Sequence, residues 1–251
     1  MKSGGNYASS LRKLVTSLRK AVPAFEWDEI DGLAGYCHGI SSKLKLWEYE
    51  LKDFSFPSQT LKIAELDKVH PVTVKNYKVV LSIEASGTFI DAGTVEDPIK
   101  DLEVNIVVTD LPGEEPESIY CAWHLDSHPP KNSKGPTASK FAHPRYHWQY
   151  GGKKVWENIN PDFYGSHLLL ESPRLPHPPL DIILAIDFVF ANYYAKQWQT
   201  LREDDEYQRV IEEAQERFWK PYFLKIQDNW MNRSAAAPLD LMPFFFPKIL
   251  D

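Results

Sequence analysis

Residues 77–85 read YKVVLSIEA, and apolar and polar side chains alternate along this stretch. The apolar members occupy every second position: Val79, Leu81, Ile83 and Ala85, with Lys78, Ser82 and Glu84 between them. Alternation with period two is typical of a half-buried strand in an antiparallel sheet, because successive side chains point to opposite faces. Residues 77–90 are therefore predicted to form a strand with one face toward a core.

The same alternation recurs in three later segments. Residues 102–109 and 118–126 repeat it, and residues 145–150 place Tyr146, Trp148 and Tyr150 on one side. A polar loop rich in Pro, Lys, Ser and Gly, residues 129–140, lies before the last of these segments. We therefore expect a four-stranded antiparallel meander.

Helical periodicity dominates on both sides of this central region. Apolar stripes with a period near 3.6 predict helices at 9–20, at 28–54, with a break near Gly32 to Gly39 as an alternative, and at 203–219. The almost wholly apolar run 181–194 predicts a buried helix. The expected fold is α+β, with the helices at 181–195 and 203–219 packed on one face of the meander and the N-terminal helices as an accessory layer. The corresponding domain division is 1–58, an N-terminal helical region, 59–225, the α+β core, and 226–251, an apolar tail.

Composition limits the classes of function. The chain has 251 residues and a formal net charge of -7, which disfavours general nucleic-acid binding. No run approaches the roughly 20 apolar residues needed to span a bilayer, and the N-terminus lacks the apolar centre of a signal peptide. The only cysteines, Cys37 and Cys121, stand in apolar surroundings, which is typical of reduced thiols. We expect a cytoplasmic protein without membrane association.

A cluster of chemically active side chains stands at the end of the third predicted strand. His124, Asp126 and His128 stand two residues apart, so in a strand they project from the face opposite Trp123 and Leu125. By the same parity, Arg145, His147 and Gln149 face outward from the fourth strand. Directly opposed residues of neighbouring antiparallel strands approach within about 5 Å. His147 or Gln149 is therefore predicted to lie beside the His-x-Asp-x-His row.

Three interpretations of this cluster stay open. His124, Asp126, His128 and His147 could hold zinc or another divalent ion and leave one position for water. Alternatively, His124 or His147 acts as a general base oriented by Asp126, with Arg145 stabilising an anionic group. The third interpretation is a polar, solvated sheet face on which histidines pair with carboxylates and perform no chemistry.

Several short motifs appear in a recognisable order. They are Pro129-Pro130 before a loop, then His143-Pro144, then Ser172-Pro173-Arg174-Leu175-Pro176 leading into Leu180–Ile186, and last Tyr207–Trp219. In this order of elements and motifs, the chain over residues 77–220 resembles the ubiquitin-conjugating enzymes and their RWD-like relatives. The resemblance implies the corresponding α+β fold and a partner protein.

One departure from that family bears on activity. In ubiquitin-conjugating enzymes the His-Pro motif is followed by the cysteine that carries the thioester, whereas no cysteine follows Cys121 in this chain. The resemblance therefore implies a non-conjugating interaction or scaffold protein that acts within a larger assembly. The alternative function is a metal-dependent hydrolase that uses the histidine cluster.

The C-terminal segment is unusually apolar. Between Pro238 and Leu250 the chain carries Leu241, Met242, Phe244, Phe245, Phe246, Ile249 and Leu250. We expect this segment to dock back onto the apolar surface of the domain, and the alternative is that it inserts into a partner protein.

Overall fold

The computed structural model describes residues 4–39, 46–60, 76–88, 97–109, 119–127, 145–151 and 175–231. The helices in these parts are α1 (Gly4–Ala21), α2 (Asp28–Gly39), α4 (Ile182–Tyr193), α5 (Ala195–Arg202) and α6 (Asp205–Met231). The strands are β1 (Leu46–Ser55), β2 (Gln59–Thr60), β3 (Asn76–Thr88), β4 (Ile99–Thr109), β5 (Ile119–Ser127), β6 (Tyr146–Tyr150) and β7 (Leu175–Pro176). The α+β class predicted from the sequence is confirmed.

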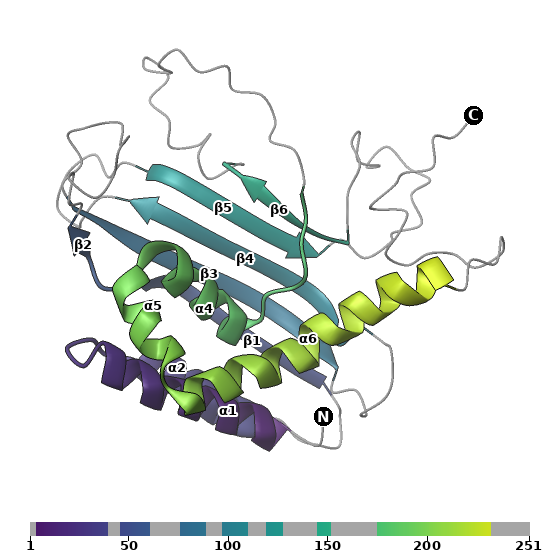
Figure 1. The fold of residues 1–251 in the computed structure, drawn as a ribbon, viewed down its shortest axis with the longest axis horizontal. Helices are drawn as coiled ribbons and strands as arrows, with labels where there is room; N and C mark the ends of the chain where they lie inside the picture. Colours follow the sequence, from purple (N-terminus) through teal and green to yellow (C-terminus); the bar gives the residue numbers. More distant parts are fainter. Residues whose placement is uncertain are drawn as a thin grey trace, which may run out of the picture.

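The strands form one antiparallel sheet, and the described helices lie on one side of it (Figure 1). Six strands lie side by side in the order β1-β3-β4-β5-β6-β7, and β2 pairs with β3 beside this path. The expected meander is present as β3, β4, β5 and β6, each paired with the next in sequence. The sheet is wider than the four strands predicted, because β1 and β7 extend it at its two edges.

Helix α2 confirms the first part of the helix predicted at 28–54, and strand β1 corrects the second part. Buried and exposed residues alternate along β1, with Trp47, Tyr49 and Leu51 facing the core. The pairing with β3 shifts between Leu51 and Phe54, where Asp53 has a φ of 47°. This bulge turns two residues three positions apart toward the same core. Leu51 and Phe54 are three positions apart, and a spacing of three also occurs on one face of an α-helix. The sequence around the bulge therefore fits a helical pattern as well.

The core lies between the sheet and the helix layer. Helix α1 buries Leu11, Leu14, Val15 and Leu18 completely, as its apolar stripe predicted. Strands β3 and β4 contribute Val79, Leu81, Ile83, Val104 and Ile106, and α4 contributes Ile182, Ile183, Ile186, Val189 and Phe190. Burial of these side chains is the main force that holds the helices on the sheet.

Helix α4 begins at a buried polar junction. Asp181 is its N-cap: the carboxylate accepts hydrogen bonds from the backbone N–H of Leu184 at 2.9 Å and from the hydroxyl of Tyr7 at 2.8 Å. The hydroxyl of Tyr49 accepts a further bond from the Ile182 N–H at 3.0 Å. Burial raises the pKa of Asp181, and the hydrogen bonds oppose that rise. The junction ties α1 and β1 to the start of α4.

The C-terminal helices differ in detail from the prediction. The helix predicted at 203–219 starts at Asp205 as α6, whereas Glu203 is the C-cap of α5. Asp204 instead accepts hydrogen bonds from the N–H groups of Glu206 and Tyr207 at the start of α6. The helix also continues through Pro221 to Met231, although it was expected to stop before this proline. Pro221 and Tyr222 are buried, so packing offsets the lost backbone hydrogen bond.

Candidate functional site

The histidine cluster lies on the sheet face opposite the helices. Asp126 on β5 is directly opposite His147 on β6, and His124 is directly opposite Gln149. Strand alternation predicted this juxtaposition, and the structure shows it. His128 lies outside the described residues, so the structure brings together three of the four side chains proposed as metal ligands.

The Asp126 carboxylate lies between two imidazoles. Its Oδ1 is 2.9 Å from Nδ1 of His147, and its Oδ2 is 3.1 Å from Nε2 of His124. His147 is buried, with 1% of its side chain exposed, whereas His124 and Asp126 are partly open to solvent. We call His124, Asp126 and His147, together with Asn105, the His–Asp–His network.

Asn105 extends the network toward the centre of the sheet. Its amide nitrogen donates to Oε1 of Glu103 at 2.9 Å, which leaves its Oδ1 facing Nδ1 of His124, also at 2.9 Å. Both partners of His124 are therefore oxygen acceptors. The two contacts are hydrogen bonds together only when both ring nitrogens carry hydrogen.

This arrangement has a consequence for metal binding. A histidine coordinates a metal through a nitrogen lone pair, and in this structure both ring nitrogens of His124 already contact side-chain oxygens. A metal ion that binds His124 would therefore have to displace the side chain of Asn105 or of Asp126 from one ring nitrogen. Among the described residues, no group of three His, Cys, Asp or Glu side chains is arranged to hold a metal. The metal role predicted for these residues stays a prediction.

Arg145 links the ends of two strands in this structure through hydrogen bonds. Its Nε donates to Oδ2 of Asp97 at 3.2 Å, and its Nη2 donates to the backbone carbonyl of Ile99 at 2.9 Å. The hydroxyl of Tyr146 donates to the same Asp97 carboxylate at 2.7 Å. The guanidinium thus connects the start of β4 to the start of β6. Its predicted role toward an anionic ligand stays a prediction.

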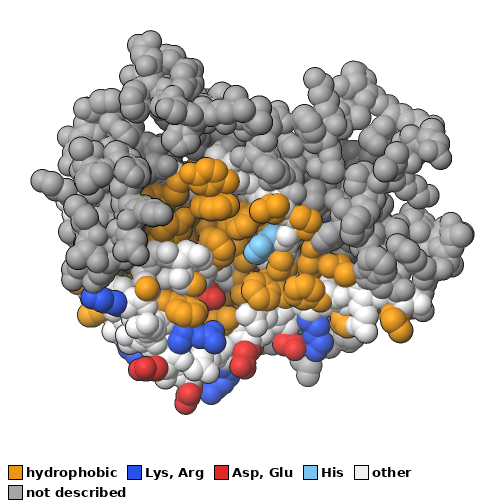
Figure 2. Space-filling view, turned by 45° about the horizontal axis from the view of Figure 1, so that its top comes forward, with side chains coloured by type: hydrophobic (Ala, Val, Ile, Leu, Met, Phe, Trp, Pro, Cys, Tyr) orange, Lys and Arg blue, Asp and Glu red, His pale blue; other side chains and the backbone are white. Residues whose placement is uncertain are grey.

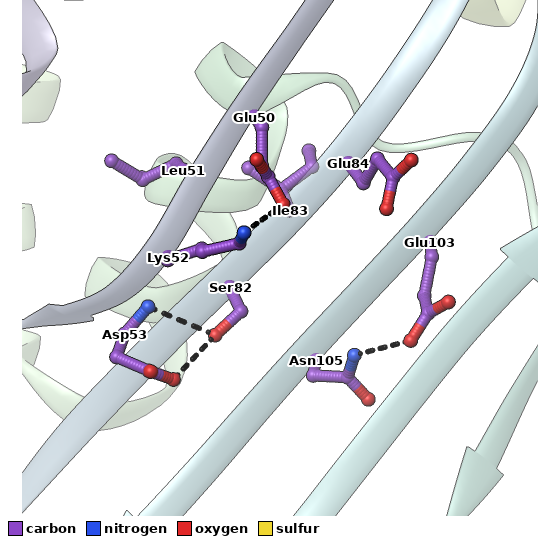
Figure 3. A pocket seen from close by; sticks show the side chains of 9 residues that line it. All are labelled: Glu50, Leu51, Lys52, Asp53, Ser82, Ile83, Glu84, Glu103 and Asn105. Carbon is purple, nitrogen blue, oxygen red and sulfur yellow. Dashed lines mark hydrogen bonds and ion pairs between the residues drawn. The ribbon is translucent and has the colours of Figure 1, made fainter.

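A hollow of about 240 Å³ adjoins the network on the same sheet face (Figure 3). It is lined by Glu50, Leu51, Lys52, Asp53, Ser82, Ile83, Glu84, Glu103 and Asn105. Glu50, Glu84 and Glu103 oppose one another across β1, β3 and β4, and Asp126 continues the row on β5. Lys52 lies 2.8 Å from Glu50. The row of four carboxylates gives this face a negative potential, which disfavours anionic ligands.

A second surface lies on the helix side of β5 and β6. The sequence assigned Trp123, Trp148 and Tyr150 to the core face correctly, but Figure 1 shows the described helices over the β1–β3–β4 side of the sheet. We define the aromatic face as Trp123, Trp148, Tyr150, Leu175, His177 and Phe188. Tyr150 is 49% exposed and Leu175 is 57% exposed. Figure 2 shows hydrophobic side chains gathered around a histidine on this side of the molecule.

Ring contacts hold the aromatic face together. The ring of Trp148 lies 5.1 Å from that of Phe188 on α4 and 5.6 Å from that of His177, measured between centroids. Trp123 contacts Tyr150 edge-to-face at 4.9 Å. Leu175 on β7 is directly opposite Trp148 on β6, so it shares this face. The spacings are those of favourable aromatic pairs, which makes the face a preformed apolar platform.

His177 keeps the aromatic face uncharged near neutral pH. Burial lowers its pKa, and its hydrogen bond to the Pro178 carbonyl opposes this effect. The Nδ1 atom lies 2.6 Å from that carbonyl oxygen, so Nδ1 carries the ring hydrogen. A neutral ring adds to the apolar character of the surface.

The two thiols are not activated as nucleophiles. Burial raises the pKa of Cys37 to about 11 and also raises the pKa of Cys121. Cys121 lies beside the aromatic face, with its Sγ 4.0 Å from the hydroxyl of Tyr193. Because the thiolate is the reactive form, both cysteines are inert at neutral pH.

Comparison of the chain with protein-family models, with curated proteins and with solved structures gave no match. Within the described residues, none of the helices is long and apolar enough to span a bilayer.

Proposed function

We propose that the protein is a non-conjugating interaction or scaffold protein of ubiquitin-conjugating-enzyme-like fold, which binds a partner protein through the aromatic face within a larger assembly. The observation that carries the proposal is the aromatic face itself. It presents two exposed apolar side chains, Tyr150 and Leu175, around the buried ring of Trp148. Aromatic anchors in an apolar patch are typical of the energetic centres of protein interfaces.

The order of elements supports the ubiquitin-conjugating-enzyme-like part of the proposal. An N-terminal helix precedes an antiparallel meander, and a buried helix and a long amphipathic helix follow it. This is the order that the sequence motifs suggested. A fold likeness alone implies no activity, so the partner-binding role rests on the surface and not on the fold.

The chemistry of the thiols supports the non-conjugating part. No cysteine follows Cys121, and burial raises the pKa of both Cys37 and Cys121. A thioester-forming nucleophile needs a thiolate at neutral pH. Reduced, unpaired cysteines also accord with the cytoplasmic location that we include in the proposal.

Two leucines at opposite edges of the sheet give a matched test. Leu175 on β7 is 57% exposed at the aromatic face, and Leu46 on β1 is 51% exposed at the other edge. In native extracts of the source cells, the protein should migrate with an apparent mass well above 28.9 kDa. Leu175→Asp should shift it to the mass of the isolated chain, because a charge in an apolar interface is costly to desolvate.

Leu46→Asp is the control and should leave the assembly intact. The proposal is wrong if the unaltered chain already migrates alone, or if both substitutions release it equally.

The second candidate function is a metal-dependent hydrolase, and the position of Asp126 between two imidazoles favours it. A carboxylate that contacts a histidine fixes the ring orientation, as in metal sites and in general-base catalysis. Metal analysis of protein purified without chelators tests this alternative. Stoichiometric metal that is lost in His124→Ala/His128→Ala would support it, and a folded protein without metal after incubation with Zn²⁺ would count against it.

A further inference from the structure

The described helices leave part of the aromatic face exposed, at Tyr150 and Leu175, and the chain carries a segment of matching apolar chemistry. We propose that residues 238–251 fold back in the isolated protein and dock on the aromatic face, so that a partner must displace them. The inference deepens the proposed function, since it rests on the same surface being the one that binds the partner.

The composition of the segment matches the chemistry of the surface. Eight of its fourteen residues are large and apolar, and three consecutive phenylalanines, Phe244–Phe246, stand at its centre. The aromatic face offers ring edges and faces of Trp148, Tyr150 and Phe188. Aromatic side chains contact one another favourably in edge-to-face geometry. Phenylalanines are therefore well suited to this platform.

The preceding helix brings the segment to the same part of the molecule. The ring of Tyr222 on α6 lies 6.0 Å from the ring of Tyr146, two residues before Trp148 on the same face of β6. Trp219 Nε1 also donates to the carbonyl of Pro179 at 2.8 Å. Helix α6 thus passes directly beside the aromatic face.

The chain is long enough to return. From Tyr222 to Met231 the helix advances about 14 Å, at 1.5 Å per residue. Tyr146 and Trp148 are roughly 7 Å apart along β6. The thirteen residues from Met231 to Phe244 span up to about 45 Å when extended. The return path is therefore well within reach.

Docking of this segment should be reversible. Burial of the eight large apolar side chains favours the docked state, whereas fixing the backbone of fourteen residues opposes it by a comparable amount. A segment that is docked this weakly excludes water from the surface, and a partner that binds the surface more tightly displaces it.

Disulfide trapping in the purified full chain tests the docked position. Lys248→Cys places a thiol beside the phenylalanines without removing one of them, and Leu175→Cys places its target on the aromatic face. The matched control combines Lys248→Cys with Leu46→Cys, at the opposite edge of the sheet. The native thiols are slow to react because burial raises the pKa of both.

We expect the 175–248 disulfide to form at least about tenfold faster than the 46–248 disulfide with oxidised glutathione, because docking raises the effective concentration. Phe244→Ser/Phe245→Ser/Phe246→Ser in the same background should reduce the rate to that of the control. Equal rates for the two pairs would overturn the inference. So would a rate unaffected by the triple serine substitution.

This test is separate from the test of the proposed function. Fast trapping with no effect of Leu175→Asp on assembly size would leave the docked segment standing and remove the partner-binding role. Slow trapping, together with release from the assembly by Leu175→Asp, would remove the docked segment and leave the partner-binding role standing.

Discussion

Asp126 and His147 face each other directly across β5 and β6, with the carboxylate Oδ1 2.9 Å from the imidazole Nδ1. Because His147 is almost completely buried, it depends on its neighbours for polar contact. The same carboxylate reaches His124 on its other side. The His–Asp–His network therefore joins the two strands through their side chains as well as through their backbones.

Removing the carboxylate of Asp126 should destabilise the fold. In Asp126→Ala the buried imidazole of His147 loses its carboxylate partner, and a polar group that loses its buried partner costs about 1–3 kcal/mol. Glu103→Gln is the control, because Glu103 lies directly opposite Asp126 but is exposed. It should change the free energy of unfolding in urea by no more than about 0.5 kcal/mol. Equal effects of the two substitutions would show that the network has no structural role.

Asp181 should contribute chiefly as a hydrogen-bond acceptor. Asp181→Ala removes the cap of α4 and leaves the buried hydroxyl of Tyr7 without this partner, so it should cost about 2 kcal/mol or more. Asp181→Asn keeps an acceptor and removes a buried charge, so it should cost less than half as much at neutral pH. Urea unfolding at pH 7 measures both, and similar losses for Ala and Asn would contradict this account.

The raised pKa of Asp181 sets the sign of its pH dependence. Between pH 3.8, the ordinary pKa of an aspartate, and the raised pKa in the folded protein, the folded protein binds more protons at this carboxyl than the unfolded chain does. Its contribution to stability is therefore present at low pH and is lost as the pH rises through the folded pKa. The stability of Asp181→Asn relative to the unaltered chain should rise from pH 3 to pH 7.

His177 should show the opposite trend with pH. Its folded pKa lies below 6.5, so between the two values the unfolded chain binds more protons at this ring than the folded protein. Stability from the neutral ring is present above pH 6.5 and declines as the pH falls toward the folded pKa. In His177→Asn, which keeps a donor toward Pro178, the loss of stability between pH 7 and pH 5 should be smaller. An unchanged loss in this variant would contradict the assignment.

Two glycines should respond in opposite ways to the same substitution. A methyl group on Gly87 would overlap the carbonyl oxygen of Pro98 and lie 2.5 Å from the Trp47 ring. Gly87→Ala should therefore cost about 1–3 kcal/mol or more. Gly35, within α2, has no such neighbour within 4 Å, and Gly35→Ala should stabilise the protein by about 0.5–1 kcal/mol. Thermal unfolding compares the two, and a gain for Gly87→Ala would refute the packing described at this position.

Strand positions were predictable where alternation was uninterrupted. Residues 77–90, 102–109, 118–126 and 145–150 correspond to β3, β4, β5 and β6 within a few residues. In β1 the bulge at Asp53 broke the alternation and produced a spacing that also fits a helix. The error has a local cause, because a single extra residue changes which side chains face the core.

The site was predictable only where a strand face determined it. Parity placed His147 beside Asp126, since register and alternation are properties of neighbouring strands. The partner of Arg145 is Asp97, 48 residues earlier, and no periodicity connects the two. The exposure of the aromatic face could not be predicted from the sequence either, because it depends on where helices distant in sequence lie over the sheet.

Photo-crosslinking in the source cells tests the central claim most directly. A photoreactive amino acid replaces Leu175 on the aromatic face or, as the control, Leu46 at the opposite edge. The account predicts one defined crosslinked protein from position 175 and none from position 46. It also predicts that Leu175→Asp weakens binding of that purified protein by about tenfold or more, equivalent to about 1.4 kcal/mol. No crosslinked protein from position 175, or the same one from both positions, would contradict it.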